Sequence, residues 1–153
     1  MPEHTDTLLS GDVIKINNFD LPHKGDVTKS IWCIFLGMDS IFDCPIIVYF
    51  CRTTTQKDDF QPGGKRENHE YKKFSKGQYG FEDDCLLDYC ERPYADITKE
   101  KFNSYIIEKR GRLPDNIIRE IWNKCIQKYL NQPQKKSIRD SFAKANITIK
   151  QKT

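Results

Sequence analysis

The sequence lacks the features of several large protein classes. Its longest apolar stretch covers only residues 45–51, whereas a helix that crosses a bilayer needs roughly 20 apolar residues. The first residues are polar and acidic, without the hydrophobic run after a basic start that marks a secretory signal. Repeats and low-complexity segments are also absent. We therefore expect a cytoplasmic protein with no membrane partner.

Metal-binding motifs are scarce as well. The chain has three histidines and no C-x-x-C pair, and the spacings Cys44 to Cys51 and Cys85 to Cys90 match no common zinc knuckle. The six cysteines lie mostly in apolar runs of a chain long enough to fold without disulfides. The sequence therefore predicts reduced core thiols and no metal.

A phosphate-binding glycine loop is missing too. The segment Gly63-Gly64-Lys65 has neither the earlier glycine nor the following Ser or Thr that a nucleotide-binding loop requires. Nucleotide hydrolysis is disfavoured, and no cofactor is expected.

What the chain does have is enough apolar material for one core. It has 153 residues, of which 37% are hydrophobic and 31% charged, with a net charge of +3. Residues 131–153 hold six basic residues and one acidic residue. We predict one domain over residues 1–131 and a basic tail over residues 132–153, solubilising or loosely ordered.

Apolar runs indicate a β-rich fold. We predict a first strand at 13–16, a loop at 17–29, two strands that are apolar on both faces at 31–36 and 45–51, and a later strand at 85–89. Residues 53–80 are polar and form a long loop, which usually marks function or disorder. Thr98 is placed to cap a short helical turn through Phe102, followed by an extended segment at 104–108.

The clearest helix lies near the C-terminus. It begins at Pro114 and ends before Pro133. Its apolar residues recur at helical spacing and form one stripe: Ile117, Ile118, Ile121, Trp122, Cys125, Ile126, Tyr129 and Leu130. This stripe must cover the sheet of its own chain or a partner.

A group of hydroxyl and cationic residues follows the third predicted strand. Residues 52–57 include Arg52, Thr54 and Gln56, which offer several hydrogen-bond donors at one sheet edge. Lys29 precedes the neighbouring strand, so an ammonium group and a threonine hydroxyl are expected side by side. The pattern is typical of phosphate recognition, and it also occurs at ordinary strand ends.

Several short segments then occur in a characteristic order, with a basic residue opening the second predicted strand. They are Gly11-Asp12-Val13-Ile14, a loop with Pro22 and Gly25, Thr54-Thr55-Gln56, Cys85-Leu86-Leu87-Asp88 and Gly111-Arg112-Leu113-Pro114. In this order, over residues 11–130, they resemble the MazF/PemK toxins of bacterial toxin-antitoxin systems.

The resemblance implies a mainly β fold with α-helix, namely a small SH3-like β-barrel with a C-terminal helix, usually as a homodimer. It implies a metal-independent endoribonuclease toxin that cleaves single-stranded RNA and is neutralised by an antitoxin protein. Attack by a ribose 2′-hydroxyl leaves a 2′,3′-cyclic phosphate. The catalytic positions carried over are Lys29, where the family commonly has Arg, and Thr54. Ser30 stands where the family commonly has Pro.

Further RNA contacts are expected beside this pair. They are Arg52, Thr55, Gln56, Lys57 and Phe60, with aromatic rings placed to stack on unpaired bases. These aromatic residues could equally be ordinary loop packing. Two other functions stay open: a catalytically inactive SH3-like barrel that binds RNA or a protein partner, and nucleic-acid binding by the basic tail alone.

Overall fold

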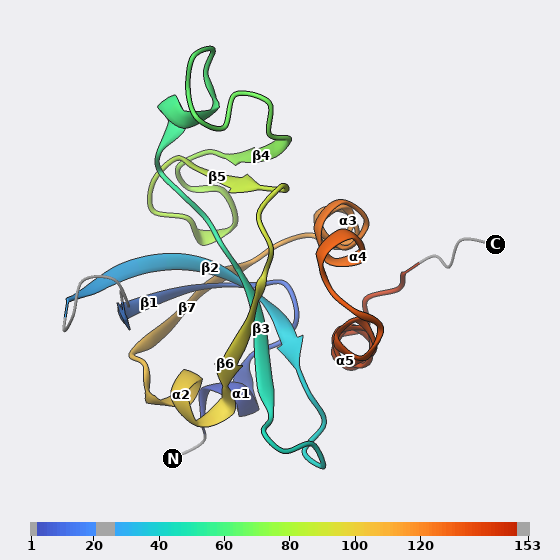
Figure 1. Ribbon diagram of the computed structural model, residues 1–153. Coiled ribbons are helices and arrows are strands. Elements are labelled where there is room, and N and C mark those ends of the chain that lie inside the picture. The colour runs from blue at the N-terminus through green and yellow to red at the C-terminus, as the bar shows by residue number, and fades with distance from the viewer. Residues whose placement is uncertain (1–2, 21–26, 150–153) are drawn as a thin grey trace.

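The computed structural model describes residues 3–20 and 27–149, and its centre is a five-stranded antiparallel sheet (Figure 1). The strand order is β6-β3-β2-β1-β7. The strands are β1 (Asp12–Asp20), β2 (Thr28–Met38), β3 (Ile47–Arg52), β6 (Tyr94–Thr98) and β7 (Ile107–Arg112). β1 and β2 form a long hairpin, so the loop predicted at 17–29 is strand at both of its ends. Pro22 and Gly25 lie outside the described residues.

β2 is the middle strand and is buried on both faces, as its continuous apolar sequence predicts. Ile31, Cys33 and Phe35 join one hydrophobic cluster, whereas Ile34 and Leu36 join the other. Alternate residues of a strand point to opposite faces. β2 therefore separates two cores, each of which must be covered.

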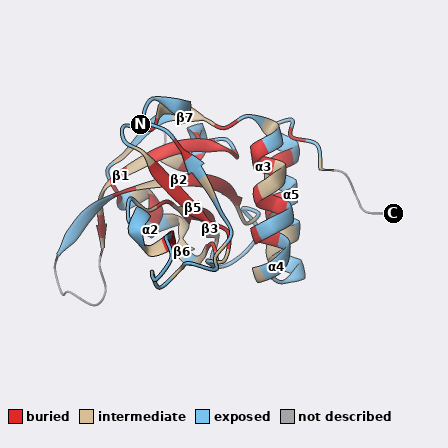
Figure 2. Cartoon of the chain, turned by 90° about the horizontal axis from the view of Figure 1, so that it is seen from above, coloured by how far each residue is buried: buried red, intermediate tan, exposed pale blue. Residues whose placement is uncertain are grey.

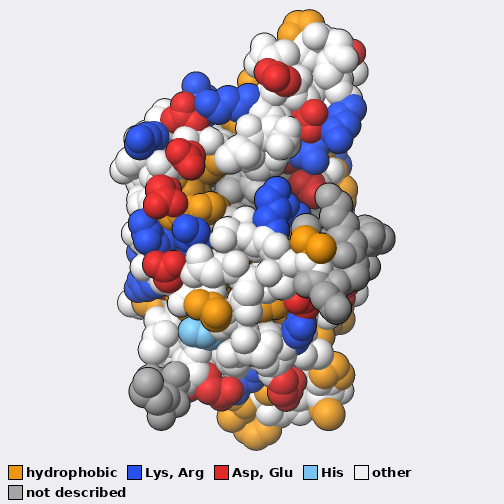
Figure 3. All heavy atoms as spheres, turned by 90° about the vertical axis from the view of Figure 1, so that its left-hand side faces the viewer, with side chains coloured by type: hydrophobic (Ala, Val, Ile, Leu, Met, Phe, Trp, Pro, Cys, Tyr) orange, Lys and Arg blue, Asp and Glu red, His pale blue; other side chains and the backbone are white. Residues whose placement is uncertain are grey.

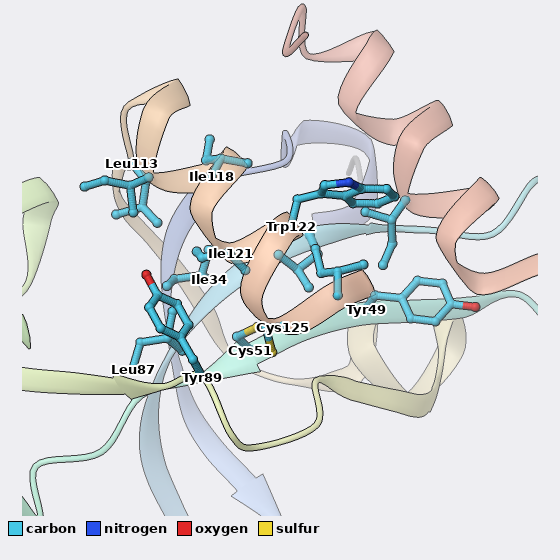
Figure 4. Close-up of a cluster of buried hydrophobic side chains, with 14 of the residues drawn as sticks. Ile34, Tyr49, Cys51, Leu87, Tyr89, Leu113, Ile118, Ile121, Trp122 and Cys125 are labelled. Atoms are coloured by element: carbon cyan, nitrogen blue, oxygen red, sulfur yellow. The ribbon is translucent and has the colours of Figure 1, made fainter. Parts of the chain in front are cut away.

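One core is covered by the C-terminal helices (Figure 2). α3 (Asp115–Ile121) continues through a π-helical turn, η4 (Trp122–Ile126), into α4 (Gln127–Tyr129). The predicted apolar stripe is confirmed, and it packs against the chain's own sheet. Ile34 of β2, Cys51 of β3 and Trp122 of the helix meet in this core (Figure 4).

A glycine allows α3 to approach the sheet. Gly11 has a φ of +91°, and a Cβ on it would lie 2.3 Å from the Cδ1 of Ile118. Only glycine fits both the backbone conformation and the contact. The Gly11 position at the start of the first strand therefore fixes how closely the helix packs.

A second helix, α5 (Gln132–Lys144), lies beside α3 and α4. Its Ile138 and Phe142 are 0% and 1% exposed and belong to the same core as α3. Most of the segment predicted as a basic tail, residues 132–153, is thus a helix that contributes to the core. The helix is hard to recognise in the sequence, because the segment is mostly basic and polar and only a few of its residues are apolar. A sequence signal for its start does exist, since Asn131 and Gln134 form a capping box.

The opposite core is closed by α1 (His4–Thr7), α2 (Lys99–Ser104) and the segment after α2. Phe102 and Tyr105 are buried there, and Phe19 packs on Tyr105. The Thr98 hydroxyl accepts a hydrogen bond from the backbone N–H of Lys101 at 3.2 Å, as predicted for the cap.

The polar segment 53–80 is more ordered than its composition indicates. It contains η2 (Lys57–Phe60), β4 (Tyr71–Phe74) and η3 (Gln78–Gly80), and β4 pairs with β5 (Cys85–Asp88). β4 and β6 were not predicted, because their sequences are polar or broken by charges. Propensity alone does not reveal a short strand that is stabilised by its partner.

The fold is therefore mixed α and β, with antiparallel strand pairing. Within residues 3–20 and 27–149 the strands form an open five-stranded sheet and a two-stranded sheet, not a closed barrel. No helix in this part of the chain is long and apolar enough to cross a membrane. The cysteines are free, and four of them are buried, as predicted.

Candidate functional site

The ends of β2 and β3 bring the predicted catalytic residues together. Cys33 lies opposite Arg52 in the antiparallel ladder. Because side chains alternate along a strand, Lys29 shares a face with Cys33 and therefore with Arg52. Lys29, Arg52 and Thr54 all line one pocket of about 230 Å³.

Thr54 is held in place by the neighbouring sheet. Its backbone N–H donates to the carbonyl of Leu86 at 2.9 Å, and its carbonyl accepts the N–H of Leu86 at 2.8 Å. The Thr54 hydroxyl oxygen accepts the backbone N–H of Gln56 at 3.1 Å. The hydroxyl proton is left to donate to a ligand oxygen in the pocket.

Some basic side chains of the pocket form ion pairs with carboxylates of the described residues, and others do not. Lys65 and Arg66 each lie 3.8 Å from Asp59. Lys29 and Arg52 also line the pocket, and neither forms an ion pair with a carboxylate of the residues that the structure describes. Lys29 and Arg52 are thus available to an anionic ligand, as far as the described residues show.

The surface around the pocket is not uniformly basic. On the face drawn in Figure 3, basic and acidic side chains alternate in small patches. Asp59, Asp83 and Glu91 line the pocket together with its basic residues. Any attraction for an anion is therefore local to the ends of the strands, since opposite charges reduce the field at a distance.

The other predicted RNA contacts divide into two groups. Thr55 and Gln56 line the pocket. Lys57 instead pairs with Asp84 at 3.0 Å, beside a shallow neighbouring depression. Phe60 is only 5% exposed and packs edge-on against Tyr71, so its ring has no free face for base stacking.

Several residues that line the pocket are not predicted from the sequence. Trp32 and Phe81 line it with their rings 5.9 Å apart. The guanidinium of Arg110 lies 5.5 Å from the Trp32 ring. Lys65 and Arg66 were visible as a basic pair after two glycines, but only the fold shows that their loop turns back to the ends of the strands.

One thiol also borders the pocket. Burial raises the pKa of Cys85 to about 11, and a hydrogen bond with Thr53 offsets part of this shift. Since the thiolate is the reactive form of cysteine, the Cys85 thiol is a poor nucleophile at neutral pH. The groups available for chemistry here are therefore ammonium, guanidinium, hydroxyl and carboxylate groups.

A separate group of side chains has the composition of a metal site. His69, Asp88 and Cys90 place their candidate ligand atoms within 4.8 Å of one another. No metal is expected from the sequence, because it has no C-x-x-C pair and its cysteine spacings match no common zinc knuckle.

The candidate site can be described only from this chain's own residues. The chain matches no protein-family model, no curated protein and no solved structure.

Proposed function

We propose that the chain is a metal-independent endoribonuclease that binds a phosphate of single-stranded RNA in the pocket at the ends of β2 and β3. The observation that carries the proposal is the meeting of Lys29, Arg52 and Thr54 in one pocket. Both cations lack a carboxylate partner within the described residues. They are thus available to an RNA phosphate, which needs positive charge and a fixed donor.

The reaction proposed is attack by the ribose 2′-hydroxyl on the adjacent phosphorus. The 2′-hydroxyl gives its proton to water as it attacks, the bond from phosphorus to the 5′-oxygen breaks, and that oxygen takes a proton from water, which leaves a 2′,3′-cyclic phosphate and a 5′-hydroxyl. Lys29 and Arg52 stabilise the negative charge on the phosphoryl oxygens, and the Thr54 hydroxyl donates to one of them. Trp32, which is only partly buried, provides aromatic surface for an adjacent unpaired base.

The fold relationship is part of the proposal. Consecutive antiparallel pairing of β1, β2 and β3, with a C-terminal helix over one face, agrees with an open form of the SH3-like arrangement. The homodimer and the antitoxin implied by the resemblance to MazF/PemK toxins stay predictions.

The direct test is cleavage of single-stranded RNA by the full chain in the presence of EDTA. We expect products with 2′,3′-cyclic phosphate ends, and no cleavage where a 2′-deoxy nucleotide replaces the attacking ribose. Lys29→Ala and Thr54→Ala should each reduce the rate at least about a hundredfold. Lys29→Arg should retain activity, because it keeps the charge, and Lys144→Ala on α5 is the exposed control.

The outcomes separate the competing functions. RNA that stays intact at stoichiometric protein, yet binds in a manner sensitive to Lys29→Ala, would favour an inactive RNA-binding protein. Cleavage that persists unchanged in both Lys29→Ala and Thr54→Ala would show that this pocket is not the active site.

A further inference from the structure

The group formed by His69, Asp88 and Cys90 lies beside the pocket, on the two-stranded sheet. Asp88 is the last residue of β5 and Cys90 follows two residues later. His69 precedes β4, and Tyr71 of β4 lies opposite Asp88. The pairing of β4 with β5 thus brings the imidazole of His69 next to a carboxylate and a thiol that follow 19 and 21 residues later in the sequence.

Asp88 is a buried carboxylate whose compensation by positive charge is incomplete. Its side chain is 2% exposed. Its Oδ1 accepts the backbone N–H of Cys90 at 2.8 Å, and its Oδ2 lies 2.8 Å from Nδ1 of His69. Arg66 reaches the same Oδ2 only at 3.5 Å, at the limit of a hydrogen bond. A buried carboxylate is costly unless a cation or a metal ion lies beside it.

Arg66 is also shared among other acidic groups. Its Nε lies 3.8 Å from Asp59, and its Nη1 lies 3.9 Å from Glu91. No single carboxylate receives a close bidentate contact from it. The charge of Asp88 is therefore open to a stronger partner.

We propose that His69, Asp88 and Cys90 bind one divalent cation of the zinc class. Thiolate, imidazole and carboxylate are the protein ligands that zinc uses, and three of them with one open position form a common arrangement. Ligands about 2.0–2.3 Å from a tetrahedral zinc lie roughly 3.3–3.6 Å apart. The ligand atoms already lie within 4.8 Å of one another, so only small shifts of the side chains are needed.

The surroundings permit entry of the ion and loss of the thiol proton. The His69 side chain is 36% exposed and Cys90 is partly exposed, so the site is open to solvent on one side. Binding releases the Cys90 thiol proton to water as the thiolate coordinates the metal. The fourth position is left to a water molecule.

This site is separate from the proposed RNA chemistry. Its three residues do not line the pocket that holds Lys29 and Thr54, although Arg66 borders that pocket and also contacts Asp88. A metal here would take the place of Arg66 beside the carboxylate. The proposal therefore holds or fails independently of RNA cleavage.

The test is titration of the purified full chain with Co²⁺ and then Zn²⁺, after removal of bound metal by a chelator. We expect one equivalent of Co²⁺ per chain, with an absorption band from charge transfer between thiolate and cobalt that Zn²⁺ abolishes by displacement. Cys90→Ser should remove the band, and His69→Gln should weaken binding at least about tenfold. Cys44→Ser is the matched control, since Cys44 is exposed and lies in the loop between β2 and β3.

A second variant gives a gain of binding. Arg66→Gln removes the cation that competes for Asp88 and should tighten Zn²⁺ binding severalfold, as measured by competition with a chromophoric chelator. A charge-transfer band that is absent, or that persists in Cys90→Ser, would overturn the proposal and leave a hydrogen-bonded ion cluster. Circular dichroism of each variant shows whether the fold is intact, so that lost binding is not confused with unfolding.

Discussion

The two ends of β2 differ in how their polar groups are used. At the end near Met38, the Ser141 hydroxyl of α5 accepts the backbone N–H of Met38 at 3.2 Å and lies 3.3 Å from its carbonyl. At the other end, Thr28, Lys29 and Ser30 are all exposed. One end of the strand is hydrogen-bonded to α5 and is called the closed end here, whereas the other, called the open end, has exposed polar side chains beside the candidate site.

This difference separates what stabilises the fold from what is available to a ligand. Groups at the closed end have protein partners, so their loss should cost folding free energy. Lys29 at the open end has no carboxylate partner in the described chain, so its loss should affect binding and leave folding almost unchanged. Substitutions at the two ends test this division.

The largest effect is expected from the helix that closes β2. Phe142→Ala empties a site that is 1% exposed and should lower the free energy of unfolding by about 4 kcal/mol. Urea denaturation measures this change. Lys144→Ala, on the exposed side of the same helix, should change it by less than about 0.5 kcal/mol. Equal stability of the two variants would mean that α5 does not close this end.

The reverse pattern is expected at the open end. Lys29→Ala should reduce RNA cleavage at least about a hundredfold, as argued for the pocket. Its free energy of unfolding should stay within about 0.5 kcal/mol of the original, because the side chain is exposed. A loss of stability as large as that of Phe142→Ala would remove the distinction between the two ends.

The close approach of Gly37 to the Ser141 side chain at the closed end gives a smaller effect. Gly37 has a φ of +153°, and a Cβ on it would lie 2.5 Å from both the Cβ and the Oγ of Ser141. Gly37→Ala should therefore destabilise the fold by about 2 kcal/mol, through strain and displacement of α5. Gly77→Ala is the control for strain alone, since Gly77 has a φ of +88° with no atom within 4 Å of that position. Thermal unfolding that is the same for both variants would exclude the contact with α5.

The same contrast explains how much the sequence could predict. β2, β3 and the helix from α3 to α4 follow from long apolar patterns, because burial dictates those residues directly. α5 does not follow from the sequence, because only a few of its residues reach the core. How much these residues stabilise the fold depends on the shape of the surface on which the helix packs. Local pattern carries little information about such a surface.

The candidate site shows a similar limit. Lys29 and Thr54 could be paired from strand order, since neighbouring strand ends share an edge. The burial of Phe60 could not be predicted from the sequence. Its ring packs inward because of its contact with Tyr71 and the path of a loop that has no periodic pattern. The convergence of His69 with Asp88 depends on a hairpin whose first strand, β4, has a polar sequence.

The smallest effect concerns the wall of the pocket, and it appears only at alkaline pH. The folded pKa of Cys85 is raised to about 11 by burial, from an ordinary value near 9. Below pH 9 the thiol is protonated in both states, so its contribution to stability is constant. As the pH rises from about 9 to about 11, the unfolded chain loses this proton first, and the free energy of unfolding falls.

Cys85→Ser should make that alkaline decline shallower in urea denaturation measured between pH 8 and pH 11. Part of the decline will persist, since burial also raises the pKa of Cys33. Cys44→Ser should leave the full decline, because the Cys44 side chain is exposed. An unchanged slope in Cys85→Ser would mean that the thiol reaches solvent, and that the wall of the pocket at the open end of β2 opens more readily than the closed end.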